Sequence, residues 1–399
     1  MSATLPGAPW RERPGLDKLL DALEAPGGAT RFVGGCVRDT LLGLEVSDVD
    51  LATRLAPDEV VKRLEKARIK AVPTGIAHGT ITAVIQGWPV EVTTLRRDVS
   101  TDGRRATIAY TDDWREDAAR RDFTINALSA DPASGEIFDH FGGLADLAAR
   151  RVRFIGDPLT RIAEDHLRIL RFFRFHARFG AGDPDPAGLE ACAVRANDLM
   201  ALSRERIADE LLKLLALPDP APTAALMIER GILKPVLPEI ASADRLAALV
   251  AAERTAGIAP QPVRRLAALL PADPDSAASV AARLRLSKRA AARLVAAIGP
   301  ADRPGDILAY EIGAAEAVDR LLLAGKLETD LAALESRPRP ELGISGGDLI
   351  AMGLPAGPIV AKTLQTIERE WARNGFDSDS EAIRALARRH VDQALRSSQ

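Results

Sequence analysis

The stretch RFVGGCVRDTLLGLEVSDVDLAT, Arg31 to Thr53, decides which fold the first part of the chain is expected to adopt. The apolar run RFV predicts a strand, and Gly34 and Gly35 allow the backbone to turn tightly into a helix that begins near Cys36. Glycines at the start of a helix expose backbone N–H groups, which bind anions such as phosphate with help from the helix dipole. An ordinary strand-to-helix turn is the alternative explanation of the two glycines taken alone.

Two aspartates separated by a single residue, Asp48 and Asp50, lie near the end of the same stretch. Side chains alternate along a strand, so in SDVDLAT both carboxylates would share one face. Carboxylates on one face repel each other unless a cation lies between them, and Mg²⁺ prefers carboxylate oxygens together with substrate phosphates. A solvated edge strand explains most isolated D-x-D patterns. Here D-x-D follows the double glycine by thirteen residues, and the combination predicts a phosphate site beside a metal site, as nucleotidyl transfer requires.

A third carboxylate is offered by the segment GTITAVIQGWPVEVTTL, which reads as a β-hairpin turning at Gly87–Trp88. The hairpin places Glu91 among Val90, Val92 and Thr93. An acidic residue in that setting needs a partner, so Glu91 is a candidate for a further catalytic carboxylate. A strand glutamate that faces solvent is the alternative.

Composition limits the class of protein. The chain has 399 residues, of which 47% are hydrophobic, enough for roughly two to four domains or subdomains. Its net charge of -3 gives the whole molecule no attraction to nucleic acid, so any such affinity has to be local. The two cysteines, Cys36 and Cys192, lack metal-ligand spacing and cannot build a disulfide framework. No apolar run approaches the roughly 18 residues of a membrane span, and we expect a cytoplasmic protein with no membrane partner.

The sequence changes character near residue 150. Short β-rich runs such as DVDLAT and PVEVTTL precede this point, whereas Ala, Leu and Arg recur afterwards at helical spacing, as in EAIRALARRHVDQAL. Pro-rich breaks at Leu217–Thr223 and Leu270–Ser276 separate groups of helices. The expected fold class is therefore α+β, with a small mixed-sheet head followed by helices alone.

Six ordered motifs resemble those of bacterial class II tRNA nucleotidyltransferases, which belong with bacterial poly(A) polymerases to the polymerase-β-like superfamily. The motifs span about residues 31–216 and read VGGCVRDTLLGLEVSDVDLAT, VPTGIAHGTITAVI, VEVTTLRRD, RRDFTINALSAD, EDHLRILRFFRFHARFG and ERIADELLKLL. A weaker match, ISGGDLIAMGLPAGPIVAKTL, is similar to part of the family's tail. The resemblance implies a catalytic head over 1–150, a neck with a nucleotide-selecting helix over 151–217, a helical body over 218–300 and a tRNA-binding tail over 301–399.

The same resemblance implies the activity and the residues that carry it. The family adds C, C and A to the 3′ end of tRNA from CTP and ATP without a template, and releases pyrophosphate. By this resemblance Asp48 and Asp50 would bind Mg²⁺, and Gly35 and Arg38 would meet the triphosphate. The full set of expected nucleotide-binding residues is Gly34, Gly35, Arg38, Arg121, Asp165, Arg168, Arg171 and Arg174.

The last four of these residues can also be argued from base chemistry. They are spaced by three, so on a helix they would form a slowly drifting stripe along one side. Cytosine and adenine share an amino donor next to a ring-nitrogen acceptor, which a carboxylate (Asp165) and a guanidinium (Arg168) would complement. Uracil and guanine would leave like groups facing each other, and an unpaired buried polar group costs about 1–3 kcal/mol.

A solvated helix face with Glu164–Arg168 pairs is the alternative interpretation of this segment. However, residues 150–178 contain eight arginines and only three acidic residues, and a local excess of that kind favours a nucleotide or RNA groove.

Two further expectations concern the loop and the reaction. The charged segment RRDVSTDGRRATIAYTDDWREDAA (residues 96–119) is expected to be a mobile loop. In the relatives it is needed for the change from C to A addition, and its completeness here favours full CCA addition. The alternatives are an A-adding or poly(A) polymerase of the same family, and a non-catalytic helical RNA-binding protein.

Overall fold

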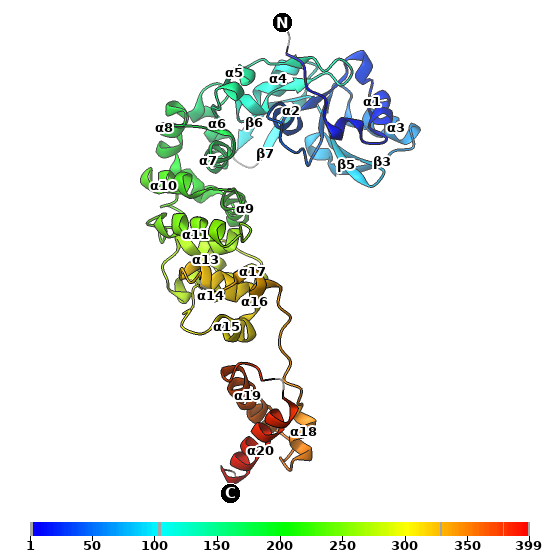
Figure 1. The fold of residues 1–399 in the computed structure, drawn as a ribbon. Helices are drawn as coiled ribbons and strands as arrows, with labels where there is room; N and C mark the ends of the chain where they lie inside the picture. Colours follow the sequence, from blue (N-terminus) through cyan, green and yellow to red (C-terminus); the bar gives the residue numbers. More distant parts are fainter. Residues whose placement is uncertain (1–2, 103–104, 328, 378, 398–399) are drawn as a thin grey trace. The chain divides into compact units, whose positions relative to one another are not determined.

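The computed structural model describes residues 3–102, 105–327, 329–377 and 379–397. The chain forms two compact units, Met1–Pro238 and Glu239–Gln399. Strands occur in the first unit, and the elements that follow α5 (Gly143–Ala148) in the described part of the chain are all helical (Figure 1). The predicted α+β class, with a sheet-containing head followed by helices, is confirmed.

The first unit is built on a seven-stranded mixed sheet within the described residues. Strands β2 and β5 are parallel, whereas the other neighbouring strands of this sheet are antiparallel. The spatial order is β3 (Lys70–Gly75), β4 (Thr80–Ile85), β5 (Trp88–Thr94), β2 (Asp50–Thr53), β1 (Thr30–Val33), β8 (Ser129–Ala130) and β9 (Ile137–Phe138).

Local sequence explains the turns of this sheet. The β4–β5 hairpin turns at Gln86 and Gly87, whose φ angles of 46° and 92° are both positive. Two central residues with positive φ match the twist of the strands that a two-residue turn joins. The predicted hairpin is therefore confirmed, with its turn one residue earlier than expected.

A second, two-stranded sheet joins β6 (Arg96–Asp102) to β7 (Arg105–Tyr110). Helix α4 (Trp114–Ala119) follows directly. The segment expected to be a loop is therefore a paired hairpin and a helix, because its backbone forms an antiparallel ladder from Arg96–Tyr110 to Asp102–Arg105. Gly103 and Arg104, which connect the two strands, lie outside the described residues.

The helices of the first unit cover the sheet and then continue as the neck (Figure 1). Their bounds are α1 (Leu16–Ala22), α2 (Gly35–Leu41), α3 (Pro57–Lys66), α6 (Pro158–Glu164), α7 (Arg168–Phe179), α8 (Pro186–Val194), α9 (Arg204–Leu215) and α10 (Ala221–Glu229). Short 3-10 turns occur at Pro9–Glu12, Ala25–Gly27, Ile76–His78, Thr124–Asn126 and Ala196–Ala201.

A cluster of phenylalanines fixes α7 against the head. Phe172 of α7 stacks on Phe154 at a ring-centroid distance of 5.5 Å, and Phe175 lies 5.1 Å from Phe123. Phe123, Phe154 and Phe172 are fully buried. Burying one such side chain stabilises the folded state by about 1.5–3 kcal/mol, so the ring contacts hold the polar face of α7 at a defined position beside the sheet.

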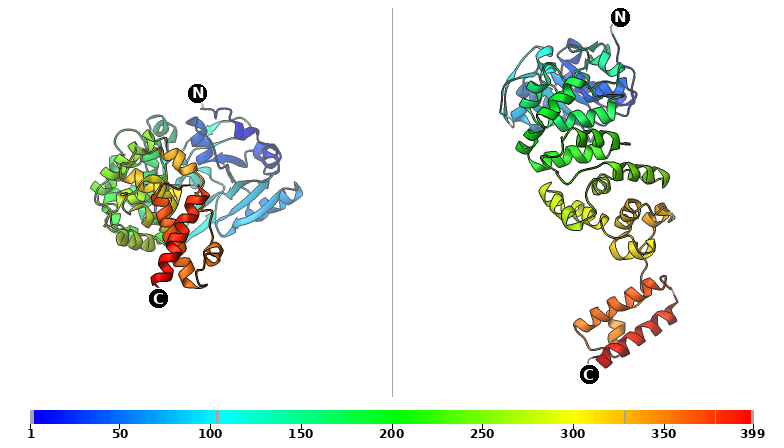
Figure 2. Two further views of the ribbon diagram at one scale, coloured as in Figure 1. Left: turned by 60° about the horizontal axis from the view of Figure 1, so that its bottom comes forward. Right: turned by 90° about the vertical axis from the view of Figure 1, so that its left-hand side faces the viewer.

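The second unit is helical throughout its described residues (Figure 2). Its helices are α11 (Asp244–Thr255), α12 (Pro262–Leu269), α13 (Pro274–Arg283), α14 (Lys288–Ala297), α15 (Gly305–Ile312), α16 (Ala314–Leu323), α17 (Leu331–Ser336), α18 (Gly346–Ala351), α19 (Pro358–Arg373) and α20 (Ser380–Ser397). The four predicted domain ranges stay a prediction.

Buried ion pairs tie several of these helices together. Arg264 of α12 contacts Glu253 of α11 at 2.7 Å and Asp319 of α16 at 3.0 Å, and each of the three side chains is at most 2% exposed. A buried charge is tolerated only when it is paired and hydrogen-bonded. The network therefore fixes how α11, α12 and α16 pack.

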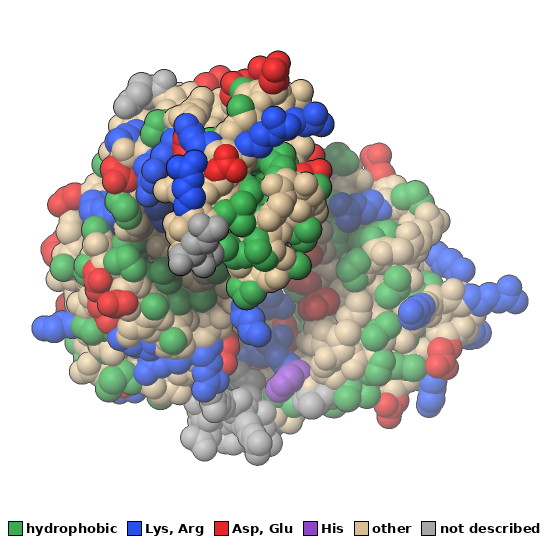
Figure 3. Space-filling view, turned by 90° about the horizontal axis from the view of Figure 1, so that it is seen from below, with side chains coloured by type: hydrophobic (Ala, Val, Ile, Leu, Met, Phe, Trp, Pro, Cys, Tyr) green, Lys and Arg blue, Asp and Glu red, His purple; other side chains and the backbone are tan. Residues whose placement is uncertain are grey.

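Charge on the visible face of the molecule is mixed. Figure 3 shows Lys and Arg side chains interspersed with Asp and Glu rather than gathered by sign, in agreement with the small net charge. Among the described residues, no helix is both long and apolar enough to cross a membrane.

Candidate active site

One cleft of the first unit brings together nearly all of the residues singled out from the sequence. Its volume is about 590 Å³. Its lining side chains come from α2, the segment before β2, the turn after α4, and the start of α7. They are Gly34, Gly35, Arg38, Asp48, Asp50, Arg120, Arg121, Asp122, Asn126, Asp165, Arg168, Arg171 and Phe175.

The two glycines form the turn from β1 into α2, as the sequence predicted. Gly34 has a φ of 68°, in the region that favours glycine, and a Cβ there would lie 2.9 Å from Nη1 of Arg121. Both glycines line the cleft, so the turn presents backbone rather than side chains there, with the guanidinium of Arg121 close to Gly34. This geometry suits a phosphate group.

If CTP is the ligand, as the resemblance implies, replacing Gly34 by alanine is expected to weaken its binding about 5- to 30-fold. The new side chain adds about 1–2 kcal/mol of backbone strain and displaces Arg121. Calorimetric titration with CTP measures the effect. Gly28→Ala is the matched control, because Gly28 also has a positive φ of 75° but a Cβ there would meet nothing within 4 Å. Equal CTP affinity in both variants would contradict the assignment.

Arg38 lies deeper in the cleft than the sequence suggested. It is 6% exposed, its Nε donates to Asp39 at 2.7 Å, its Nη1 donates to Asn126, and it lies 4.1 Å from the centre of the Phe179 ring. Burial lowers the pKa of this guanidinium below its usual value, although Asp39 opposes the shift. Arg38 is held rigidly and presents a fixed positive charge to the cleft.

The two carboxylates predicted to bind a metal, Asp48 and Asp50, lie on different kinds of backbone. Strand β2 begins at Asp50, so Asp48 is in the exposed segment before the strand, and the expectation of one continuous strand through both was wrong. The pairing with β5 starts at the same point, where Asp50 lies opposite Glu91. The N–H of Glu91 donates to the carbonyl of the residue before, Val49, at 3.3 Å. Asp48 and Asp50 nevertheless line the same cleft.

Glu91 is directly opposite Asp50 in the parallel pair of β2 and β5, and its side chain is exposed. Burial, helped by the charges of Glu91 and Asp48, raises the pKa of Asp50 to about 6, and Arg121 opposes the shift. Glu91 is not among the residues that line the cleft. It acts on Asp50 through its charge.

These carboxylates fit a divalent cation of the hard, oxygen-preferring kind. Among the described residues no group of three His, Cys, Asp or Glu side chains is arranged to hold a metal by itself. Mg²⁺ is commonly held by one or two carboxylates and completes its shell with substrate phosphates and water. Burial contributes most to the raised pKa of Asp50, and the repulsion from Glu91 and Asp48 that adds to it is what a bound cation would offset.

Arg121 connects the carboxylate end to the glycine turn. Its Nη2 lies 3.4 Å from Asp117, and its Nη1 donates to the carbonyl of Asn126 at 3.3 Å. Neither contact is short, and the side chain is 20% exposed. The contacts of Arg121 are thus longer than the shortest contacts of Arg38, Arg168 and Arg171. Its guanidinium is positioned to meet an anion.

Asp165 does not belong to the helix that carries the arginines. It interrupts the chain between α6 and α7 with an extended backbone, and its Oδ1 accepts the N–H of Leu167 at 3.1 Å. The predicted four-residue stripe is corrected to three residues on α7. The prediction assumed one continuous helix through residues 165–174. Instead, the side chain of Asp165 accepts a backbone N–H that a continuous helix would use, and α7 begins after it.

Asp165 and Arg168 both face the cleft, but each is bound to a different partner. Arg206 of α9 donates to the two carboxylate oxygens of Asp165 at 3.0 and 2.8 Å. Arg168 donates to Glu164 at 2.5 Å and to the carbonyls of Arg161 and Arg120 at 2.9 and 3.0 Å. The Glu164–Arg168 pair of the alternative interpretation is thus present, and it orients the guanidinium at the cleft wall.

The remaining arginines of the stripe differ in their exposure to the cleft. Arg171 lines it and contacts Asp122 at 2.6 Å, whereas Arg174 lies outside the lining set and contacts Glu210 at 2.6 Å. Burial by itself would raise the pKa of Asp122, but Arg171 and Asn126 hold it below its usual value. Arg174 therefore does not face the cleft and instead ties α7 to α9 through its ion pair with Glu210.

Sequence reasoning missed the partners that fix these side chains. The partners are Asp122, Asn126, Arg206 and Glu210. Asp122 and Asn126 are spaced i,i+4 inside RRDFTINA, and Arg206 and Glu210 have the same spacing inside ERIADELLKLL. That spacing marks one face of a helical segment, but it does not say which distant residue the face meets.

Comparisons with known proteins find relatives for most of the chain. Residues 30–153 match a family model described as the poly A polymerase head domain, and residues 183–244 match one described as a probable RNA and SrmB-binding site of polymerase A. The chain is 32% identical over 388 residues to the human mitochondrial CCA tRNA nucleotidyltransferase 1, covering 92% of this chain and 88% of the relative. It is 31% identical over 390 residues to a CCA-adding enzyme of Geobacillus kaustophilus, covering 92% and 94%.

A solved structure extends the likeness to the fold. The crystal structure of the Bacillus stearothermophilus CCA-adding enzyme in complex with CTP matches with a TM-score of 0.70 and 24% identity. The match covers 96% of this chain and all of the other. The head and helical parts therefore share one architecture with that protein.

Proposed function

The chain belongs to the family of CCA-adding tRNA nucleotidyltransferases, and we propose that its head cleft carries out their reaction with Asp48 and Asp50 at the reacting phosphate and Asp165 and Arg168 at the base. The protein is a CCA tRNA nucleotidyltransferase that adds C, C and A to the 3′ end of tRNA from CTP and ATP. Nucleotidyltransferases of this family depend on a metal ion.

One observation carries the proposal. A single cleft of about 590 Å³ is lined by two carboxylates, the glycine turn and the arginines Arg38 and Arg121, and it also contains Asp165 and Arg168. The residues proposed for triphosphate chemistry (34–50) and those proposed for base selection (165–168) thus line one cleft, although the two groups lie over 100 residues apart in the sequence.

The reaction is a single transfer without a covalent enzyme intermediate. The 3′ oxygen of tRNA forms a bond to the α-phosphorus, while the bond from that phosphorus to the bridging oxygen of the β-phosphate breaks. Pyrophosphate leaves with the electron pair, and the hydroxyl proton passes to water. Mg²⁺, held by Asp48 and Asp50, would stabilise the charge that develops on the phosphate oxygens.

The protein's own residues position the nucleotide for this transfer. The backbone N–H groups after Gly34 and the guanidiniums of Arg38 and Arg121 hold the triphosphate. Arg38 is fixed in advance by Asp39 and Asn126. Fixed donors need no reorganisation when the phosphate charge shifts, and this is the main way that such sites accelerate transfer.

Base selection rests on Asp165 and Arg168. The carboxylate would accept from the amino group of cytosine or adenine, and the guanidinium would donate to the adjacent ring nitrogen. Arg206 and the N–H of Leu167 restrain the carboxylate, and Glu164 restrains the guanidinium. A restrained pair rejects uracil and guanine because it cannot turn to accommodate their reversed pattern.

Removing Arg206 is expected to reduce the preference for CTP over UTP about tenfold, because Asp165 loses one of its two restraints. Arg206→Lys should recover part of the preference, since an ammonium still pairs with the carboxylate. Single-turnover rates with each nucleotide at saturating tRNA measure the ratio. Lys213→Ala is the control on the same helix, because Lys213 forms an exposed pair with Asp209. A purely structural role would change the rates with both nucleotides equally.

The proposed reaction is tested by product length. Transcripts of one tRNA that end before C74, after C74, after C75 or after A76 are incubated with CTP, ATP or both. We expect extension to A76 and no further, with C required before A. Open-ended A tails on every transcript would establish a poly(A) polymerase instead, and no extension in any mixture would leave an RNA-binding protein.

Two finer points form part of the same proposal. Mg²⁺ is the metal that the carboxylate and phosphate oxygens favour over softer ions. A cytoplasmic location is favoured by the tRNA substrate and by Cys36 and Cys192, which are free thiols in the described structure.

A further inference from the structure

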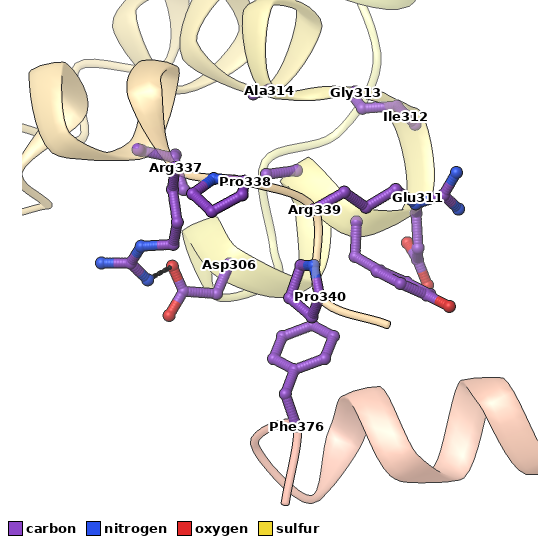
Figure 4. Close-up of a pocket in the computed structure, with 13 residues that line it drawn as sticks. Asp306, Glu311, Ile312, Gly313, Ala314, Arg337, Pro338, Arg339, Pro340 and Phe376 are labelled. Carbon is purple, nitrogen blue, oxygen red and sulfur yellow. Dashed lines mark hydrogen bonds and ion pairs between the residues drawn. The ribbon is translucent and has the colours of Figure 1, made fainter. Parts of the chain in front are cut away.

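A second cavity, about 450 Å³ in volume, lies in the second unit and has no part in the reaction described above. Its walls come from α15, the start of α16, the segment 337–340 and the residue Phe376 after α19. Figure 4 shows Phe376 approaching Pro340, with the Arg337–Asp306 ion pair on the other side. The volume falls in the range of sites for small planar ligands, about 300–1,000 Å³.

The aromatic wall of this cavity is built under strain. Phe376 has a φ of 60°, which bulky side chains rarely adopt. Its N–H donates to the carbonyl of Trp371 at 3.1 Å. Its ring lies 5.3 Å from Tyr310 and 5.1 Å from Trp371. This backbone conformation places the ring of Phe376 in the wall of the cavity, beside the partly exposed Tyr310.

Arginines surround the aromatic wall. Arg339 lies over the ring of Tyr310 at 4.7 Å. The neighbouring cavity shares Tyr310 and Arg339 and is also lined by Arg369 and Arg373. Within the described residues, these three arginines have no carboxylate within 4 Å, whereas Arg337 is paired with Asp306 at 2.6 Å. Glu311 and Glu368 also line this neighbouring cavity, and Glu311 pairs with Arg303. The rim therefore keeps an excess of positive charge, with Arg339, Arg369 and Arg373 against Glu368.

We propose that this cavity binds an unstacked base of the RNA substrate, with the adjoining arginines at the flanking phosphates. Aromatic rings beside unpaired arginines are the recognised means of holding single-stranded nucleic acid, because every base has a face that can stack. A purely apolar ligand would gain nothing from the unpaired arginines. The inference rests on the proposed function, since it takes tRNA as the ligand.

A variant that fills the cavity tests the proposal without removing its aromatic residues. Ala309 lines the cavity on α15, so Ala309→Phe should obstruct the base, and Ala309→Ser is the matched control. Stacking contributes about 5- to 150-fold to affinity per base. We expect Ala309→Phe and Tyr310→Ala to raise the Kd and KM for tRNA lacking CCA about tenfold, with kcat at saturating tRNA unchanged.

The phosphate part of the proposal has its own readout. Arg369→Gln and Arg373→Gln should each reduce the slope of log affinity against log salt by about one. Fluorescence anisotropy of labelled tRNA at several salt concentrations measures this slope. Unchanged slopes in both variants would overturn the assignment of these arginines to phosphates.

A crosslinking experiment identifies the occupant. Wild-type enzyme is irradiated with a tRNA transcript containing 4-thiouridine, and in a separate arm with 4-thiouridine monophosphate alone. Crosslinks from tRNA to peptides containing Tyr310 or Phe376, absent in Ala309→Phe, would support the proposal. Saturable crosslinks from the mononucleotide alone would assign the cavity to a free nucleotide and overturn it.

Failure of the inference is distinguishable from failure of the proposed function. If all variants transfer C with wild-type KM for tRNA and no crosslink maps to the cavity, the base-binding inference is wrong and the enzyme assignment stands. If the wild-type chain transfers no nucleotide to any transcript, the proposed function itself is wrong.

Discussion

Asp50→Ala is expected to lower the rate of C addition by at least about 10³-fold while leaving the fold intact. Asp50 lines the cleft and is one of the two carboxylates proposed to hold the metal ion. A bound divalent ion supplies several kcal/mol of charge stabilisation in the transition state, and each factor of ten in rate corresponds to about 1.36 kcal/mol. Asp48→Ala should behave alike, because Asp48 lines the same cleft. Single-turnover transfer of one C to tRNA lacking CCA measures the rate, and circular dichroism verifies the fold.

Two further variants make this result specific. Asp58 is an exposed acid of α3, away from the lining residues, so Asp58→Ala should keep the wild-type rate. Glu91→Gln should have an intermediate effect, since Glu91 adjoins Asp50 but does not line the cleft. Near-normal turnover in Asp50→Ala would refute the assignment of this carboxylate to the reaction.

Asp165→Ala is expected to lower the preference for CTP over UTP and for ATP over GTP by about 10²-fold. A buried polar contact that is reversed in the wrong nucleotide costs about 1–3 kcal/mol, and sites built on hydrogen bonds discriminate more strongly than apolar ones. Overall nucleotide affinity should fall less, because the proposed triphosphate contacts at Gly34, Arg38 and Arg121 are unchanged in this variant. Ratios of kcat/KM for the four nucleotides measure the preference.

The control for this variant is Asp209→Ala, which removes an exposed carboxylate of α9. It should leave all four ratios unchanged. An equal loss of rate with CTP, ATP, UTP and GTP in Asp165→Ala would show that the carboxylate supports the cleft without reading the base.

Local patterns in the sequence were sufficient for much of the head. The turn at Gly34, the hairpin around Gly87 and the onset of α2 follow from backbone preferences of a few adjacent residues. The switch from β-rich to Ala- and Leu-rich sequence near residue 150 predicted the helical remainder. The grouping of Asp48, Asp50 and Arg121 came from the resemblance of ordered motifs.

Contacts between distant segments could not be predicted in the same way. Asp165 pairs with Arg206, and Arg171 pairs with Asp122, at separations of 41 and 49 residues. No periodicity encodes such partners, because they depend on how α7 packs on α9 and on the head. The break at Asp165 was missed for a related reason, since propensity favours one continuous helix until a side chain competes for its N–H groups.

The same limit explains the second cavity. Tyr310, Arg339 and Phe376 are spread over 67 residues, and none of the three lies in the tail motif at residues 344–364. Only the packing of α15 and α19 brings them together. The strained backbone at Phe376 is likewise invisible in the sequence, because Gly375 before it is the usual residue for such a turn.

A structure of the enzyme with CTP and a tRNA transcript ending before C74 tests the central claim most directly. We predict the α-phosphorus beside Asp48 and Asp50, the remaining phosphates at the Gly34 turn and Arg38, and the cytosine edge on Asp165 and Arg168. A nucleotide whose phosphates lie away from the two aspartates, or whose base edge meets other side chains, would contradict the account.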